Sequence, residues 1–329
     1  MREGWLSTFR ELQLEGFAGV RRTKEPIKLA KFTVLVGPNN SAKTTLLLVL
    51  FMFASPDPVP LMEVSKVSFL EKYLSRDPAS LIYLYSGKGR ARCTLMSGRD
   101  LYLLEVSKAG VTVSSASELD PRISTLLENA ESALTLKEST AALIPHSRRF
   151  EEDLMKMLVD KWEDVQATGA HVDLVKSLVE KGVVSDRFTE VTLHRDYLVL
   201  RKEVERRGVY VKLSDQGDGV RRFVVAGLWL EAFKPKVVLW DDLEASAHPF
   251  FVKEVLEWLA ERDWQVVAST HSIDVLHELT VVRPEDALVV SLYKDSSDVL
   301  VAKPYTLDEV DELFEKGLDV RKLLAGGRS

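Results

Sequence analysis

The fold follows from one stretch near the N-terminus, Lys31-Phe-Thr-Val-Leu-Val-Gly37-Pro-Asn-Asn-Ser-Ala-Lys43-Thr44. Its first six residues are rich in strand-forming types and end at a glycine, and residues 46–54 form an apolar run. This order predicts a buried strand, a loop over residues 37–42 and an apolar helix that begins near Lys43.

The loop nearly matches the phosphate-binding pattern G-x-x-x-x-G-K-S/T, with Ala42 in place of the second glycine. In this pattern backbone amides and a helix N-terminus hold phosphates, the lysine reaches the outer phosphates, and the hydroxyl binds magnesium. A plain strand-loop-helix connection is the alternative, and we expect the Cβ of Ala42 to crowd a bound phosphate. The candidate nucleotide-binding residues are Gly37, Pro38, Asn39, Asn40, Ser41, Ala42, Lys43, Thr44 and Thr45, with Thr44 also a magnesium ligand.

A second motif is the apolar run 237–240, which ends in Asp241 and Asp242. This position places both carboxylates at the carboxyl edge of a sheet, where open α/β folds bind ligands. We expect Asp241 to hold magnesium, directly or through water, and Asp242 to orient an attacking water. The alternative interpretation is a strand followed by a solvated acidic turn.

A histidine follows the next apolar strand, residues 265–269. From the end of that strand, His271 could reach a γ-phosphate, although a lone histidine is more often structural.

Strand, helix and strand succeed one another between residues 237 and 269, and the strands are apolar, which predicts a parallel sheet covered on both faces. Residues 97–100 are typical of a hairpin turn, and residues 121–181 have a helical pattern too short for a coiled-coil rod. We therefore expect an N-terminal lobe (1–110), an inserted helical lobe (111–189) and a C-terminal lobe (190–329).

The composition excludes several classes of protein. With 44 Lys and Arg against 50 Asp and Glu, the 329 residues carry a net charge of −6, so any contact with DNA must be local. One cysteine, Cys93, excludes an intramolecular disulfide and fits the cytoplasm, and the longest apolar run is too short to span a membrane. Few Asn and Gln beside many charged residues is a bias typical of proteins from hot environments.

Taken together, the order of these motifs resembles the ABC-type ATPase heads of the SMC, RecF and OLD-like families. The resemblance covers the first 50 residues, through Leu12-x-Leu14-x-Gly16-Phe17, and roughly residues 190–280, through the segment that begins Asp241-Asp242-Leu-Glu244. The ending, with Gly317-Leu-Asp-Val-Arg321, resembles the tail of the OLD-like ATPases. The resemblance implies an α/β P-loop NTPase fold: an ABC-ATPase-like head with a β-rich N-terminal lobe and an inserted short helical lobe.

In these families ATP and Mg²⁺ are bound between two protomers. The resemblance therefore implies an ATPase that forms a homodimer on ATP, in which Ser214, Gly217 and Gly219 approach the γ-phosphate held by the partner's Lys43. A glycine-rich turn before a helix can expose amides to an anion, although it can equally be a simple connection. Asp218 falls in the same turn, and its carboxylate would repel a phosphate.

Three departures from the family pattern predict slow hydrolysis. They are Ala42, Asp242 where these ATPases carry Glu, and the absence of Gln between Thr44 and Gln166 for the usual Q-loop. Asp is one methylene shorter than Glu, and the position of the attacking water tolerates little displacement.

The sequence alone does not decide what the protein binds. Lys88, Arg90 and Arg92 alternate on one strand face and could follow DNA phosphates, as expected for families that act in chromosome organisation or repair, although a solvated face would look the same. The alternative functions are a nucleotide-sensing scaffold without hydrolysis, in a defence or toxin–antitoxin system, and a transporter-type ATPase subunit.

Overall fold

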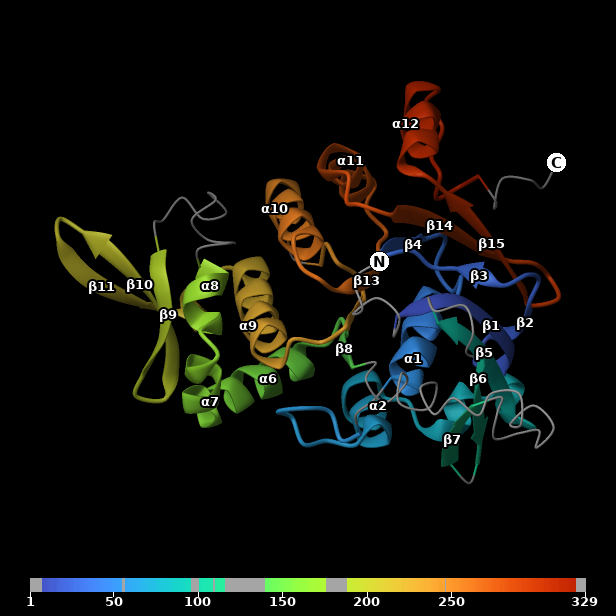
Figure 1. The fold of residues 1–329 in the computed structure, drawn as a ribbon, viewed down its shortest axis with the longest axis horizontal. Helices are drawn as coiled ribbons and strands as arrows, with labels where there is room; N and C mark the ends of the chain where they lie inside the picture. The colour runs from blue at the N-terminus through green and yellow to red at the C-terminus, as the bar shows by residue number, and fades with distance from the viewer. Residues whose placement is uncertain are drawn as a thin grey trace, which may run out of the picture.

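The computed structural model describes residues 8–54, 57–95, 101–108, 110–115, 140–175, 188–245 and 247–323. Figure 1 shows a large sheet on one side of the molecule and a small three-stranded sheet at the opposite end. Within the described residues, none of the helices combines the length and the apolar composition of a transmembrane span.

One end of the large sheet is a group of parallel strands in the order β14-β4-β13-β12-β8. All residues of β4, β8, β12 and β13 are buried, which agrees with the predicted parallel sheet covered on both faces. Because the strands are parallel, their carboxyl ends meet at one edge. Their bounds are β4 (Phe32–Val36), β8 (Ala141–Ile144), β12 (Val237–Trp240), β13 (Gln265–Ser269) and β14 (Ala287–Lys294).

The rest of the large sheet is the β-rich part, in the order β7-β6-β5-β1-β2-β15, with β3 paired to β1. β5 and β6 pair antiparallel as the hairpin pattern predicted, and the turn at residues 97–100 lies outside the described residues. The bounds are β1 (Phe9–Phe17), β2 (Val20–Thr23), β3 (Ile27–Lys28), β5 (Gly89–Leu95), β6 (Leu101–Ser107), β7 (Gly110–Ser115) and β15 (Val299–Tyr305).

Helices cover both faces of the parallel strands: Figure 1 shows α1 on one side and α10 and α11 on the other. In α1 every residue except Thr44 is buried, as expected for a helix that is apolar on all sides. The bounds are α1 (Lys43–Phe53), α2 (Lys66–Leu74), α9 (Asp218–Phe233), α10 (Pro249–Ala260), α11 (Ile273–Val282) and α12 (Leu307–Glu315), with short 3-10 helices η2 (Pro78–Leu81), η3 (Tyr83–Tyr85) and η5 (Leu213–Asp215).

The small sheet packs beside a group of helices that includes α9. A Cβ added to Gly227 of α9 would lie 2.6 Å from Cδ1 of Leu174, so a larger residue where α8 meets α9 would require that side chain to move. The bounds are α6 (Arg148–Asp160), α7 (Trp162–Ala167), α8 (Ala170–Leu174), β9 (Phe188–His194), β10 (Tyr197–Val204) and β11 (Arg207–Lys212).

The structure corrects the helical interpretation of residues 121–181 at one place. Ala141–Ile144 is β8, a strand of the large sheet paired with β12, and not part of a helix. A run of only four apolar residues has too little periodicity to distinguish a strand from a helix. Residues 121–139 and 176–181 lie outside the described residues, and the division into three lobes stays a prediction.

Candidate functional site

The loop after β4 has an unusual backbone. Gly37 has φ +143°, and a Cβ there would lie 2.3 Å from the carbonyl oxygen of Leu292. Asn40 and Ala42 also have positive φ, at +63° and +75°. Asn tolerates this left-handed conformation, whereas Ala pays about 1–2 kcal/mol of strain in it. At position 42 the loop therefore has a backbone conformation that suits glycine, although the residue there is alanine.

The helix that follows this loop begins without a side-chain cap. Ala42 is the N-cap of α1 and offers no side-chain acceptor. Side chains of Ser65, Ser147, Ser272 and Thr306 do cap α2, α6, α11 and α12. An uncapped N-terminus leaves amide donors available to an anion.

Lys43 is the first residue of α1 and is only 6% exposed. Its Nζ donates to the carbonyl oxygens of Gly37 at 2.9 Å and Pro38 at 3.1 Å. Burial lowers the pKa of Lys43, although nearby carboxylates, that of Asp242 foremost, act in the opposite direction. The amine of Lys43 therefore contacts the same loop that a bound phosphate would contact.

Thr44, Asp241 and Ser269 form a hydrogen-bonded unit. Thr44 Oγ1 donates to Asp241 Oδ2 at 2.9 Å, and Ser269 Oγ donates to Asp241 Oδ1 at 2.6 Å. Asp241 is 7% exposed; burial raises the pKa of its carboxyl, and the two hydroxyl donors act against this rise.

This unit fits magnesium in its donor chemistry. Mg²⁺ prefers oxygen ligands and is held by one or two carboxylates together with substrate phosphates. No group of three or more His, Cys, Asp or Glu side chains that could hold a metal occurs in the described part of the chain. A magnesium ion would therefore depend on Thr44, Asp241 and the phosphates that it accompanies.

The neighbouring Asp242 is held mainly through its backbone. Its φ is +50°, its N–H donates to Ser269 Oγ at 2.9 Å, and its carbonyl oxygen accepts from Arg222 Nη1 at 2.9 Å. The carboxylate lies 3.1 Å from His146 Nδ1 and 3.9 Å from His271 Nε2. Neither His146 nor Arg222 is among the site residues that the sequence predicts.

Arg222 projects from α9 and is 2% exposed. Besides Asp242, it donates to the carbonyl oxygens of Asp241 at 2.9 Å and Ala245 at 3.2 Å. The sequence holds little signal for this role, because Arg222 directly follows Arg221 and precedes the apolar part of the helix.

The loop of His271 is held by two residues from other parts of the chain. Glu244 Oε1 accepts from the N–H groups of His271 at 2.8 Å and Ser272 at 3.0 Å. Arg321, in the tail segment that carries part of the family resemblance, donates to the carbonyl oxygen of His271 at 2.5 Å. Strand ends, Glu244 and the tail together place the imidazole beside Asp242.

The glycine-rich turn lies apart from this cluster. Ser214 is exposed and its hydroxyl bonds Asp215 at 3.2 Å, and Gly217 is the exposed N-cap of α9, which has no side-chain cap. Gly219 is buried in the first turn of α9. In the part of the chain that the structure describes, no hydrogen bond or ion pair joins the turn to Lys43 or Thr44. Asp218, expected to repel phosphate, pairs with Arg221 at 2.9 Å.

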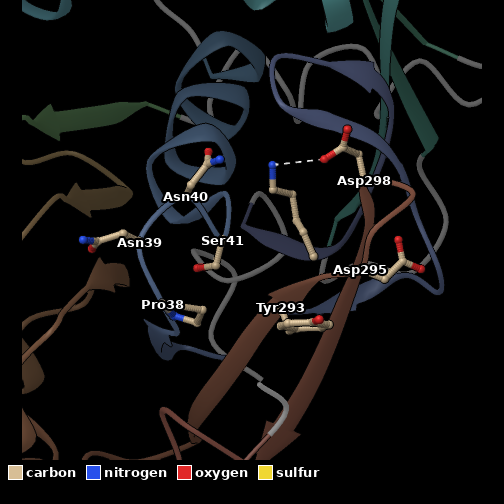
Figure 2. Close-up of a pocket in the computed structure, with 8 residues that line it drawn as sticks. Pro38, Asn39, Asn40, Ser41, Tyr293, Asp295 and Asp298 are labelled. Atoms are coloured by element: carbon tan, nitrogen blue, oxygen red, sulfur yellow. Dashed lines mark ion pairs between the residues drawn. The ribbon is translucent and has the colours of Figure 1, made fainter. Parts of the chain in front are cut away.

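A pocket of about 460 Å³ opens beside the loop that follows β4. Figure 2 shows loop residues on one side of it and residues of the β14–β15 hairpin on the other. The amine of Lys294 lies 3.5 Å from Asp298 and donates to the carbonyl oxygen of Gly19 at 2.8 Å. The lining residues are Pro38, Asn39, Asn40, Ser41, Tyr293, Lys294, Asp295 and Asp298.

The basic stripe is partly neutralised. Arg90 and Arg92 are exposed on the same face of β5, and Lys88 lies just before the strand. Lys88 and Arg90 both pair with Glu105 of β6, Arg90 at 3.2 Å. Cross-strand pairing of this kind depends on strand register, which the sequence pattern of β5 does not contain.

Comparison with known families shows to which family the chain belongs. The model of the family described as "AAA domain, putative AbiEii toxin, Type IV TA system" matches residues 100–276, more than half of the chain, and the chain belongs to this family. The matched residues include Asp241, Asp242 and His271. A comparison with curated protein sequences gave no match.

Solved structures with the same fold are heads of SMC proteins. The SMC head domain from Thermotoga maritima is 15% identical, with 91% of this chain and 99% of that chain covered and a TM-score of 0.51. An SMC head bound to the C-winged helix domain of ScpA is 13% identical, with 92% and 99% covered and a TM-score of 0.59. The protein therefore belongs to a P-loop ATPase family and has the fold of an SMC-type head, which confirms the resemblance and the predicted fold class.

Proposed function

We propose that this protein binds ATP with Mg²⁺ at the phosphate loop and hydrolyses it. The observation that carries the proposal is the Thr44–Asp241 hydrogen bond beside the buried amine of Lys43. These are a hydroxyl, a carboxylate and an ammonium group in the positions from which a magnesium ion and the outer phosphates of ATP can be bound. The strained loop and the uncapped α1 supply the backbone donors.

On binding, Lys43 exchanges its contacts with the carbonyl oxygens of Gly37 and Pro38 for contacts with the outer phosphates. Thr44 and Asp241 would hold the magnesium ion, which would supply positive charge against that of the phosphates. The pocket between the loop and Tyr293 takes the nucleoside, because it adjoins the loop and has a volume within the range of small-ligand sites.

In the chemical step, a water oxygen attacks the γ-phosphorus, the bond to the β–γ bridging oxygen breaks, and ADP and phosphate form. Asp242 orients this water and accepts its proton, and His271 faces the γ-phosphate. Asp reaches one methylene less far than Glu, and a displacement of about 1 Å lowers such rates about a hundredfold. Hydrolysis is therefore slow.

The site is completed by a second copy of the chain. The exposed turn and the N-terminus of α9, which has no side-chain cap, support this part of the proposal, since such a helix start leaves backbone amides available to an anion. The residues that approach the γ-phosphate across the dimer are Ser214, Gly217 and Gly219. Pairing of Asp218 with Arg221 reduces the repulsion expected from its carboxylate. A homodimer with two ATP molecules follows.

The test uses Lys43→Ala with ATP and magnesium. We expect the variant to lose ATP binding in calorimetry and to remain monomeric in light scattering, whereas the unmodified protein dimerises. Arg283→Ala, an exposed change at the C-cap of α11, is the control and should dimerise normally. ATP-dependent dimerisation of Lys43→Ala would refute the proposal.

DNA is the proposed substrate of the ATP-bound dimer, through Lys88, Arg90 and Arg92. Glu105 offsets two of these charges, so Glu105→Gln should tighten DNA binding, and reversal of the three charges to Glu should weaken it. A filter-binding salt titration measures both changes. Three coincident curves would remove this surface from the proposal. The cytoplasmic location stays a prediction.

A nucleotide sensor without hydrolysis, within a toxin–antitoxin system, is the second candidate. The description of the family and the replacement of Glu by Asp242 favour it. Phosphate release measured in a single turnover separates the two functions, because a sensor binds ATP and releases no phosphate. The transporter-type subunit has no observation in its favour.

A further inference from the structure

The structure brings one more histidine to the hydrolytic residues. β8 runs parallel to β12 with Ile144 opposite Trp240, and the N–H of Asp241 donates to the carbonyl oxygen of Ile144 at 2.9 Å. The segments that leave these two strands therefore run side by side. His146, two residues after β8, meets Asp242 in this way, although 96 residues separate them in the sequence.

His146 is fixed from both sides along the chain. It lies between the buried strand β8 and Ser147, whose hydroxyl caps α6 by accepting from the N–H of Phe150 at 3.4 Å. Its side chain is nevertheless 57% exposed, so it faces the water at the edge of the sheet. The fold thus sets the position of the His146 backbone, and the exposed imidazole is open to reactants.

The carboxylate of Asp242 depends on this imidazole for its direction. Ser269 and Arg222 bond the N–H and the carbonyl oxygen of Asp242 and leave its side-chain torsions unconstrained. The nearest nitrogen of His271 is 3.9 Å from the carboxylate, beyond hydrogen-bond distance. In the described residues, the hydrogen bond to the carboxylate is the one with His146 Nδ1 at 3.1 Å.

We propose that His146 is a positioning residue for ATP hydrolysis, which holds the carboxylate of Asp242 toward the attacking water. The proposal rests on the proposed function of Asp242. A short carboxylate has little tolerance for misorientation, because loss of alignment by about 1 Å lowers the rate about a hundredfold. The hydrogen bond from His146, which directly follows the loop residue after strand β8, supplies that alignment.

The experiment compares His146→Ala, which removes the donor, with His146→Asn, whose amide can place a donor near the position of Nδ1. His194→Ala, which removes another exposed histidine on the β9–β10 hairpin, is the matched control. Phosphate release is measured in a single turnover with saturating ATP and magnesium, and ATP affinity is measured by calorimetry.

We expect His146→Ala to release phosphate about 10- to 100-fold more slowly with ATP affinity changed less than about twofold, and His146→Asn to recover most of the rate. A double variant His146→Ala/Asp242→Ala should be no slower than Asp242→Ala alone, because His146 acts through that carboxylate. Rates within about twofold of the unmodified protein for His146→Ala, or equal losses in the Ala and Asn variants, would overturn this proposal alone. Absence of phosphate release by the unmodified protein would instead overturn the proposed function.

Discussion

The two long apolar helices that follow glycine-containing turns, α1 and α9, begin in similar ways and end up in different surroundings. Neither has a side-chain cap at its N-terminus. The start of α1 is enclosed by the strand ends of its own chain, where Thr44 meets Asp241. The start of α9 faces solvent, and a Cβ on Gly217 would touch nothing within 4 Å. One half of the proposed ATP site is thus assembled within the chain, and the other is presented outward.

Arg222 connects these two regions. It belongs to the second turn of α9 and bonds three carbonyl oxygens after β12, including those of Asp241 and Asp242. Its guanidinium lies 5.8 Å from the ring of Trp240, at the end of the same strand. A shift of α9 on contact with a second molecule would therefore also move the backbone at Asp241 and Asp242, because Arg222 bonds their carbonyl oxygens.

The largest expected effect contrasts the glycines of the two turns. Gly37→Ala should destabilise the fold by about 3 kcal/mol or more, because its Cβ meets a backbone oxygen and its φ is unsuited to alanine. Gly217→Ala should change stability by less than about 1 kcal/mol, since the space is open, φ is −57°, and the poorer N-cap that alanine makes is offset by the lower entropy of the unfolded chain. Urea unfolding measures both, and equal losses would contradict the contrast. Only the second variant can then be examined for weaker ATP-dependent dimerisation.

The connection between the regions gives the next effect. Arg222→Ala should destabilise the fold by about 2–4 kcal/mol, because carbonyl oxygens beside a buried side chain lose their donor. The adjacent Arg221→Ala is the matched control and should lose less than about 1 kcal/mol, since it breaks a pair with the exposed Asp218. Chemical denaturation measures the free energy of unfolding of both variants. A similar loss of stability in both would mean that α9 is not held through Arg222.

A smaller effect concerns the buried carboxylate of Asp241, which accepts a hydrogen bond from Thr44 of α1. Burial raises the pKa of Asp241, so the folded state favours the neutral acid, and stability without ligand falls as pH rises from the ordinary value of 3.8 through the raised one. Asp241→Asn should therefore raise the unfolding temperature of the ligand-free protein by about 2 °C at pH 7. It should also abolish the effect of magnesium on ATP binding.

Asp218→Asn, at the exposed start of α9, is the control for this measurement and should leave the unfolding temperature unchanged. A pH series of thermal melts should show the gain of Asp241→Asn shrinking toward acidic pH. A constant gain at every pH would show that burial of the charge is not its cause.

The smallest effect relieves strain in the loop. Ala42→Gly should stabilise the protein by about 0.5 kcal/mol, because removal of left-handed strain exceeds the entropy that glycine adds to the unfolded chain. Ala18→Gly, at another alanine with positive φ, is the control for stability. Calorimetry should show tighter ATP binding only for Ala42→Gly. Equal ATP affinities in all three proteins would separate the strain from nucleotide binding.

Much of the candidate site was predictable because its residues directly follow buried strands. The strands before Gly37, Asp241 and His271 were recognisable as apolar runs, and parallel strands end at one edge. His146 escaped recognition because β8 is short, although Pro145 and His146 after an apolar run were a usable signal. The pocket beside the loop was not predictable, because the β14–β15 hairpin reaches it from a distant part of the chain.

Local order along the chain was enough to specify the loop after β4, the acidic strand end and the apolar helix α1, because each is a contiguous pattern with its own backbone chemistry. Strand order and register decided the rest. They placed β8 beside β12, so that His146 reaches Asp242, and they set Glu105 against Lys88 and Arg90. Contacts between residues far apart in sequence depend on how strands pair, and no single segment contains that information.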